Sequence, residues 1–219
     1  MFNQTSKLEN YTELLDNLYE VFVAPILFGE KTGKPSFDWE SPPSFFDAGT
    51  LSRCSFDAYQ DIKSSIDKKT THLGDSIAYL YPEYATATDS LNQIVAILQR
   101  ENNVNSLALS NYPIYYREFK GHNGFMGWHT NYDYPGDRWY FVYNTDDRCS
   151  FFRYVDSDTD SIITKWEPKG WSLNHFVVGN RDNPFWHCVY TDAHRVSFGI
   201  RNVASPLFKQ FKWKNVVLR

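Results

Sequence analysis

Two short segments in the second half of this 219-residue chain contain residues whose types and spacing suit metal chemistry. The first holds His129 and Asn131, and the second, much later, holds His187 followed by Arg195 and Ser197. Residues two apart on a β-strand point to the same face, about 6.6 Å apart. One strand therefore directs His129 and residue 131 towards one ion, with His187 as the natural ligand from a distant strand. Arg195 and Ser197 share one face of the next strand, and this combination is suited to gripping a carboxylate.

The order of these residues resembles that of the Fe(II)- and 2-oxoglutarate-dependent oxygenases, which are built on a double-stranded β-helix (jelly roll). The likeness covers about 112–203, is strongest to prolyl-hydroxylase-like members, and extends to small stand-alone members found in phages and marine bacteria. It implies that His129 and His187 ligate Fe(II). It also implies that Arg195, helped by Ser197, binds the distal carboxylate of 2-oxoglutarate as cosubstrate.

The residue two after the first histidine departs from the family pattern. The family has Asp or Glu there, whereas this chain has Asn131, which offers only a neutral carbonyl oxygen. Three alternatives remain open. Asn131 ligates through that oxygen; Asp133 ligates instead, which requires the chain to turn at 131–133; or the third protein position is empty and the site does not hold iron.

Aromatic residues make up 18% of the chain and are concentrated after residue 112. Most fill the core, because strands favour them. The rings nearest the proposed ligands are expected to wall the substrate pocket and to keep bulk water out: Trp128, Tyr132, Trp139, Tyr140 and Trp186.

Three other features have competing interpretations. His194 is an alternative ligand to His187, but it adjoins Arg195, so the two side chains point to opposite faces of a strand. Arg201 is a reserve carboxylate binder on the strand face of Arg195. The basic segment 209–219 has interleaved aromatic residues that suit contact with nucleic acid, although a solvated terminal strand or arm explains it more simply.

The composition limits the class of protein. A hydrophobic fraction of 42%, a charged fraction of 22% and a net charge of −4 are ordinary for a globular chain. They exclude a coiled-coil rod and a disordered tail. A small negative net charge also provides no overall electrostatic attraction for nucleic acid. Three cysteines without paired spacing, and the lack of a leader-like or membrane-spanning apolar segment, predict a cytoplasmic protein that does not contact a membrane.

The pattern of residues predicts a single domain over 1–219 that is α+β and mainly β. A helical N-terminal layer over 1–105 supports a jelly-roll core over 106–219. Apolar spacing predicts helices at about 7–22, 56–68 and 89–102, with an irregular connection at 30–55. Short aromatic and β-branched segments predict strands at 112–119, 138–143, 149–155, 161–166, 173–178, 185–190 and 195–203.

The leading functional hypothesis is an Fe(II)- and 2-oxoglutarate-dependent oxygenase that hydroxylates a peptide side chain or a small molecule and releases succinate and CO2. The alternative is a catalytically inert jelly-roll module with a structural or protein-binding role, such as a component of a phage particle. Asn131 motivates this alternative. A weaker third option is a cupin-like enzyme that uses another metal and no keto acid.

Overall fold

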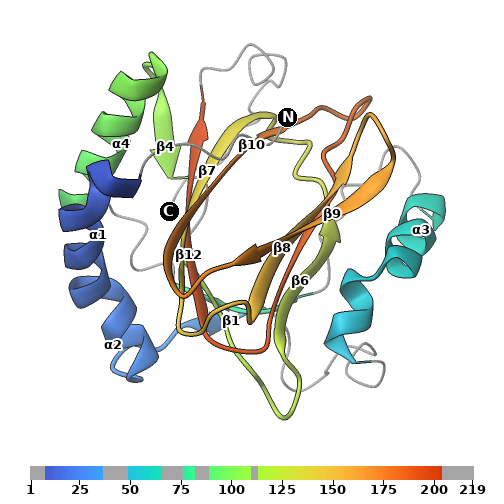
Figure 1. Ribbon diagram of the computed structural model, residues 1–219, viewed down its shortest axis with the longest axis horizontal. Coiled ribbons are helices and arrows are strands. Elements are labelled where there is room, and N and C mark those ends of the chain that lie inside the picture. The colour runs from blue at the N-terminus through green and yellow to red at the C-terminus, as the bar shows by residue number, and fades with distance from the viewer. Residues whose placement is uncertain (1–7, 37–48, 66–75, 82–88, 110–112, 204–219) are drawn as a thin grey trace.

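Two antiparallel β-sheets face each other and carry helices on their outer surfaces (Figure 1). The structure, a computed structural model, describes residues 8–36, 49–65, 76–81, 89–109 and 113–203. The basic segment 209–219 lies outside these residues. Among them the fold is mostly antiparallel strand with few helices, as the composition of the second half predicts.

The larger sheet has seven strands in the order β1-β3-β5-β12-β7-β10, with β4 also paired to β12. Its strands are β1 (Lys34–Pro35), β3 (Tyr79–Leu80), β4 (Leu107–Leu109), β5 (Ile114–Tyr116), β7 (Gly136–Asn144), β10 (Gly170–Val178) and β12 (Arg195–Asn202). The smaller sheet has five strands in the order β2-β6-β11-β8-β9. They are β2 (Ser76–Ile77), β6 (Gly124–His129), β8 (Ser150–Asp156), β9 (Ser161–Glu167) and β11 (His187–Thr191).

The helices lie where apolar spacing predicts them. One continuous helical segment comprises a 3-10 turn (Leu8–Tyr11), α1 (Thr12–Leu18), a π-helical turn (Tyr19–Val23) and α2 (Ala24–Leu27). It continues beyond the predicted end and through Pro25, which has no N–H to donate to the carbonyl oxygen of Val21. Nζ of Lys31 donates to that oxygen instead, at 3.1 Å. A second 3-10 turn (Thr50–Cys54) leads into α3 (Phe56–Ser65), and α4 is Asp89–Asn102.

Hydrophobic side chains form three clusters that correspond to these layers. The first lies between α1, α2 and α4 and the outer face of the larger sheet, and it includes Phe22, Leu98 and Phe198. The second lies between α3 and the smaller sheet and includes Tyr59 and Trp128. The third lies between the two sheets. The helices therefore cover the outer faces of the two sheets, and the inner faces remain available to form a site.

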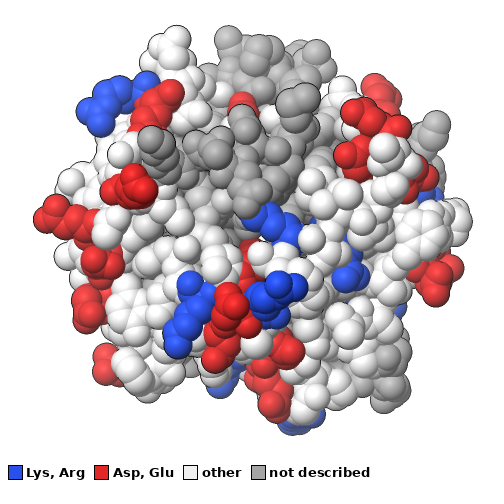
Figure 2. Space-filling view, in the orientation of Figure 1, with Lys and Arg blue, Asp and Glu red and all other residues white. Residues whose placement is uncertain are grey.

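Two differences from the sequence-based expectations stand out. The strand β6 was not among the predicted segments, because it begins with Gly124 and its three apolar residues are interrupted by Gly127. The first half of the chain also supplies the edge strands β1 and β2, and β3 between β1 and β5, in addition to helices. Among the described residues, no helix has the length and apolar character needed to cross a membrane. In Figure 2 basic and acidic side chains adjoin each other near the centre of the face shown.

Candidate functional site

His129 and His187 lie side by side on neighbouring strands of the smaller sheet. Their Cα atoms are paired across β6 and β11, and their ring centroids are 4.1 Å apart. The register shifts between this pair and the pairing of Val189 with Met126, so β6 contains an extra residue. Such a β-bulge redirects side chains, and here both Met126 and His129 line the same interior cavity although they are three residues apart.

Backbone carbonyl groups fix the orientation of both imidazoles. Nδ1 of His129 lies 2.8 Å from the carbonyl oxygen of Gly127, and Nδ1 of His187 lies 3.0 Å from that of Phe185. A carbonyl oxygen can only accept, so each Nδ1 carries the proton. Each Nε2 is then left with the lone pair that a metal ion requires.

The pKa of the His187 imidazole lies well below its usual value. Burial is the largest cause, and the neighbouring His129 and the positive charge of Arg138 lower it further. The ring is therefore neutral at physiological pH. Neutral imidazole is the form that ligates metals.

Asn131 completes this cluster from the turn that follows β6, so the expectation that it shares one strand with His129 is wrong. Its amide nitrogen Nδ2 donates to Nε2 of His187 over 3.2 Å. Two atoms bound to one ion at about 2.1 Å are about 3.0 Å apart at a right angle and about 3.4 Å apart at a tetrahedral angle. The spacing therefore suits two ligands of one ion once the amide is rotated to present its oxygen.

The backbone at Asn131 explains how its side chain comes to face the histidines. Its φ of 54° is left-handed, and its carbonyl oxygen accepts from the N–H of Tyr134 at 2.9 Å to close a turn. Asn and Asp enter this region more readily than other residues with side chains. The backbone geometry thus accommodates either residue and does not itself select the amide.

The chain does turn at 131–134, as ligation by Asp133 requires, but Asp133 has a different neighbour. One of its carboxylate oxygens lies 3.4 Å from Nη2 of Arg181, in a partly exposed ion pair. Within the described part of the chain, no group of three or more His, Cys, Asp and Glu side chains is arranged to hold a metal ion. A metal between the two histidines would have the side chain of Asn131 beside it, because that side chain lies 3.2 Å from Nε2 of His187.

The histidines open into a cavity of about 280 Å³ between the sheets. Arg195 and Ser197 line it from β12, together with His129, Asn131 and His187. The structure therefore brings together the five residues of the two sequence segments. His194 lies elsewhere, because its Nδ1 is 2.6 Å from the hydroxyl of Tyr115 on another face of the molecule.

The aromatic residues expected to wall the pocket are divided between several surroundings. Tyr140 lines the cavity and stacks on Phe176. Trp128 packs on Tyr59 in the cluster beneath α3, and Trp139 belongs to the cluster beneath α1 and α4. Both point away from the cavity because adjacent residues on a strand face opposite sides. His129 and Tyr140 take the inward positions.

The remaining two rings also lie outside the cavity wall. Trp186 lines a separate groove of about 430 Å³ beside α3, and it packs on Tyr59. Tyr132 is buried in the turn after β6, where the guanidinium of Arg181 lies over its ring. The wall is instead supplied largely by aliphatic and aromatic side chains that were not singled out in the sequence: Leu80, Ile114, Tyr116, Met126, Phe152, Phe176 and Val189.

One functional residue was missed altogether. Glu167, at the end of β9, is fully buried and binds Arg195. A single acid after Trp166 and before a Pro-Lys-Gly turn is typical of an exposed strand end, so hydrophobic patterning contains no signal for it. Arg201, the reserve carboxylate binder, lies over the ring of Tyr134.

No family model matches the chain, and no curated protein sequence matches it. Among solved structures, the chain is similar to a prolyl-4-hydroxylase from Pseudomonas putida at 12% sequence identity. The superposition covers 84% of this chain and 98% of that one, with a TM-score of 0.42.

Proposed function

We propose that this chain is a metal-dependent oxygenase that uses a 2-oxo acid and O2, with Fe(II) held by His129, His187 and Asn131. The observation that carries the proposal is the pair of buried, adjoining imidazoles. Each has Nδ1 bound to a carbonyl oxygen, and both open into one interior cavity. The donor set suits the metal, since imidazole nitrogen and an amide oxygen are ligands that Fe(II) accepts.

We also propose that the two sheets form a jelly roll. The strand order supports this proposal, because β5, β12, β7 and β10 adjoin in one sheet while β6, β11, β8 and β9 adjoin in the other. Chain-distant strands are therefore neighbours, and the two histidines, which are far apart in sequence, become a cross-strand pair.

The iron, when bound, supplies the activation of O2 and the oxidation of an unreactive C–H bond. The protein's own residues hold and shield the reactants. Gly127 and Phe185 fix the two imidazole rings through their carbonyl oxygens. The apolar wall keeps water from the cavity, and Arg195 and Ser197 supply polar groups at the wall opposite the smaller sheet.

The overall reaction balances without another reductant. A 2-oxo acid, O2 and a substrate C–H give CO2, the carboxylic acid one carbon shorter, and the hydroxylated substrate; 2-oxoglutarate would give succinate. A peptide side chain or a small molecule remains the proposed substrate class. The test is to incubate anaerobically purified protein with Fe(II), a panel of 2-oxo acids and O2, and to measure the shortened acid.

A matched variant gives this experiment its control. His187→Ala removes one proposed ligand, whereas His122→Ala removes a histidine from a surface loop. We expect turnover in the wild type and in the His122 variant, and none in the His187 variant. A wild-type protein that consumes no 2-oxo acid, or a His187 variant that retains full turnover, would contradict the proposal.

An inert binding module is the second candidate, favoured by the amide at position 131 in place of a carboxylate. Metal content separates the two proposals. Stoichiometric iron, manganese or nickel in the purified protein argues against the inert module. A protein that binds none of these ions, even when they are added, supports it.

A further inference from the structure

Arg195 already has a carboxylate partner within the protein. Its Nε donates to Oε2 of Glu167 at 2.7 Å and its Nη2 donates to Oε1 at 2.9 Å. The arginine side chain is 2% exposed and the glutamate side chain 0%. A bidentate pair of this kind is the strongest arrangement that the two groups can make.

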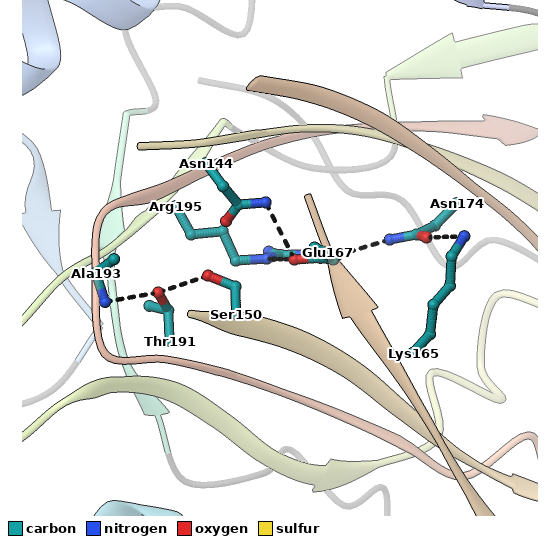
Figure 3. Close-up of polar contacts among 8 residues, drawn as sticks. All are labelled: Asn144, Ser150, Lys165, Glu167, Asn174, Thr191, Ala193 and Arg195. Atoms are coloured by element: carbon teal, nitrogen blue, oxygen red, sulfur yellow. Dashed lines mark hydrogen bonds and ion pairs between the residues drawn. The ribbon is translucent and has the colours of Figure 1, made fainter. Parts of the chain in front are cut away.

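Glu167 is held in place by further donors (Figure 3). Nδ2 of Asn174 donates to Oε1 at 2.8 Å, and Nδ2 of Asn144 lies 3.5 Å from Oε2. Lys165 donates to Oδ1 of Asn174 at 2.9 Å, which fixes the orientation of that amide. These contacts come from β7, β9 and β10, so the carboxylate cannot leave Arg195 without breaking several bonds.

The glutamate is ionised in this network. Burial alone would raise the pKa of Glu167. The charge and hydrogen bonds of Arg195, together with hydrogen bonds from Asn174 and Asn144, outweigh the effect of burial and lower this pKa. Arg195 therefore faces a fixed negative charge. A second carboxylate at Arg195, such as the distal one of 2-oxoglutarate, would lie beside Glu167 in a buried site, where like charges repel strongly.

The rest of the cavity wall does not compensate for this repulsion. Arg195 is the one Lys or Arg side chain among the described residues that line the cavity. Lys165 is not part of that wall. The ring of Tyr116 lies 5.2 Å from the guanidinium of Arg195, and the uncharged Ser197 lies two residues along β12. Ile114 and Val189 add apolar surface to the same cavity.

We infer that the cavity selects a 2-oxo acid with an uncharged, apolar tail and disfavours the diacid 2-oxoglutarate, because Glu167 neutralises Arg195. This inference rests on the proposed function and specifies its cosubstrate class. The 2-oxo acid end lies towards the histidines, and the tail lies against the apolar wall beside the neutralised arginine.

A binding experiment tests the inference without relying on turnover. Two probes are titrated calorimetrically, under anaerobic conditions, into protein loaded with Mn(II). One is 2-oxoglutarate, and the other is 5-methyl-2-oxohexanoate, in which an isopropyl group replaces the distal carboxylate. We expect the wild type to bind the apolar probe at least about tenfold more tightly.

Glu167→Gln removes the internal charge while it keeps a side chain of the same size. We expect this variant to shift the ratio of the two dissociation constants by at least about tenfold towards 2-oxoglutarate. Glu13→Gln, on the exposed face of α1, is the matched control and leaves the ratio unchanged. Circular dichroism of each variant verifies that it is folded.

The wild-type titration decides the question even if the Glu167 variant does not fold. Tighter binding of 2-oxoglutarate than of the apolar probe overturns the inference and leaves the proposed function standing. An unchanged ratio in a folded Glu167→Gln variant also overturns it. Failure of the Mn(II)-loaded wild type to bind either 2-oxo acid overturns the proposed function and the inference together.

Discussion

Replacing Asn131 by Asp restores a carboxylate beside the two histidines and should strengthen metal binding. The amide nitrogen of Asn131 is 3.2 Å from Nε2 of His187, within the range of about 3.0 to 3.4 Å for two ligands of one ion. An aspartate oxygen at the same place therefore needs no movement of the backbone. Asp also tolerates the φ of 54° at this position.

The size of the effect follows from two opposing contributions. A negative charge next to a divalent ion in a buried site is strongly attractive, but removing the carboxylate from water offsets much of this gain. We expect a net increase in Mn(II) affinity of about tenfold to a hundredfold, or about 1.4 to 2.8 kcal/mol. Isothermal titration at neutral pH measures it.

Asn131→Gly is the matched control for this substitution. Glycine adopts a positive φ without strain, so the variant removes the side chain and preserves the turn. We expect it to bind Mn(II) more weakly than the wild type. If the Asp variant binds no more tightly than the wild type and the Gly variant binds as well as it does, residue 131 does not contact the ion and the assigned ligand set is wrong.

Three further predictions concern stability. Arg195→Met leaves Glu167 buried without its counter-charge and should lower the free energy of unfolding by about 3–5 kcal/mol in urea titrations; an unchanged midpoint would mean that the pair does not form. The pKa of Glu167 is lowered from its ordinary 4.5, so its stabilising contribution is complete above about pH 4.5 and is lost as the pH falls through the lowered folded value. Glu167→Gln should therefore lose less stability than the wild type when the pH is lowered, as measured by thermal unfolding. Equal losses in the two proteins would contradict this prediction. Phe198→Ala removes a buried ring that packs at 5.1 Å from Phe22 and should cost about 3–5 kcal/mol, whereas a loss below about 1 kcal/mol would show that the helical layer does not depend on this contact.

Local patterns in the sequence determine most of the helices and strands. The apolar spacing between Leu91 and Leu98 predicts a helix over 89–102, and the structure has α4 at Asp89–Asn102. The aromatic segments after residue 138 become β7 to β12 within a few residues of their expected ends. The short strands β1 to β4 and the strand β6 were not predicted. In β6, two glycines in six residues weaken the strand signal.

Part of the site can also be predicted, because side chains alternate between the two faces of a strand. Alternation along single strands is enough to place Arg195 and Ser197 on one face, and the structure has both on the cavity wall. The same alternation turns Trp128 and Trp139 away from the cavity, so proximity in sequence to a proposed ligand is a poor guide to the pocket wall. The β-bulge in β6 is a property of strand pairing, and sequence spacing alone does not reveal it.

Glu167 shows what depends on tertiary structure alone. Its neighbours in sequence give it the pattern of a strand end, and its partners Asn144, Asn174 and Arg195 come from three other strands. The pairing of β7 with β10 and with β12 brings the three partners together, and Glu167 reaches them from β9 of the smaller sheet. A buried charged network of this kind cannot be predicted without the sheet topology.

The central claim is that His129 and His187 hold one metal ion at the end of the interior cavity. The most direct test is a crystal structure of the protein with Mn(II), in which an anomalous difference map locates the manganese. We predict one ion per chain, bonded to Nε2 of both histidines and to the amide oxygen of Asn131. An Mn(II)-saturated crystal with no ion between the two imidazoles would contradict it.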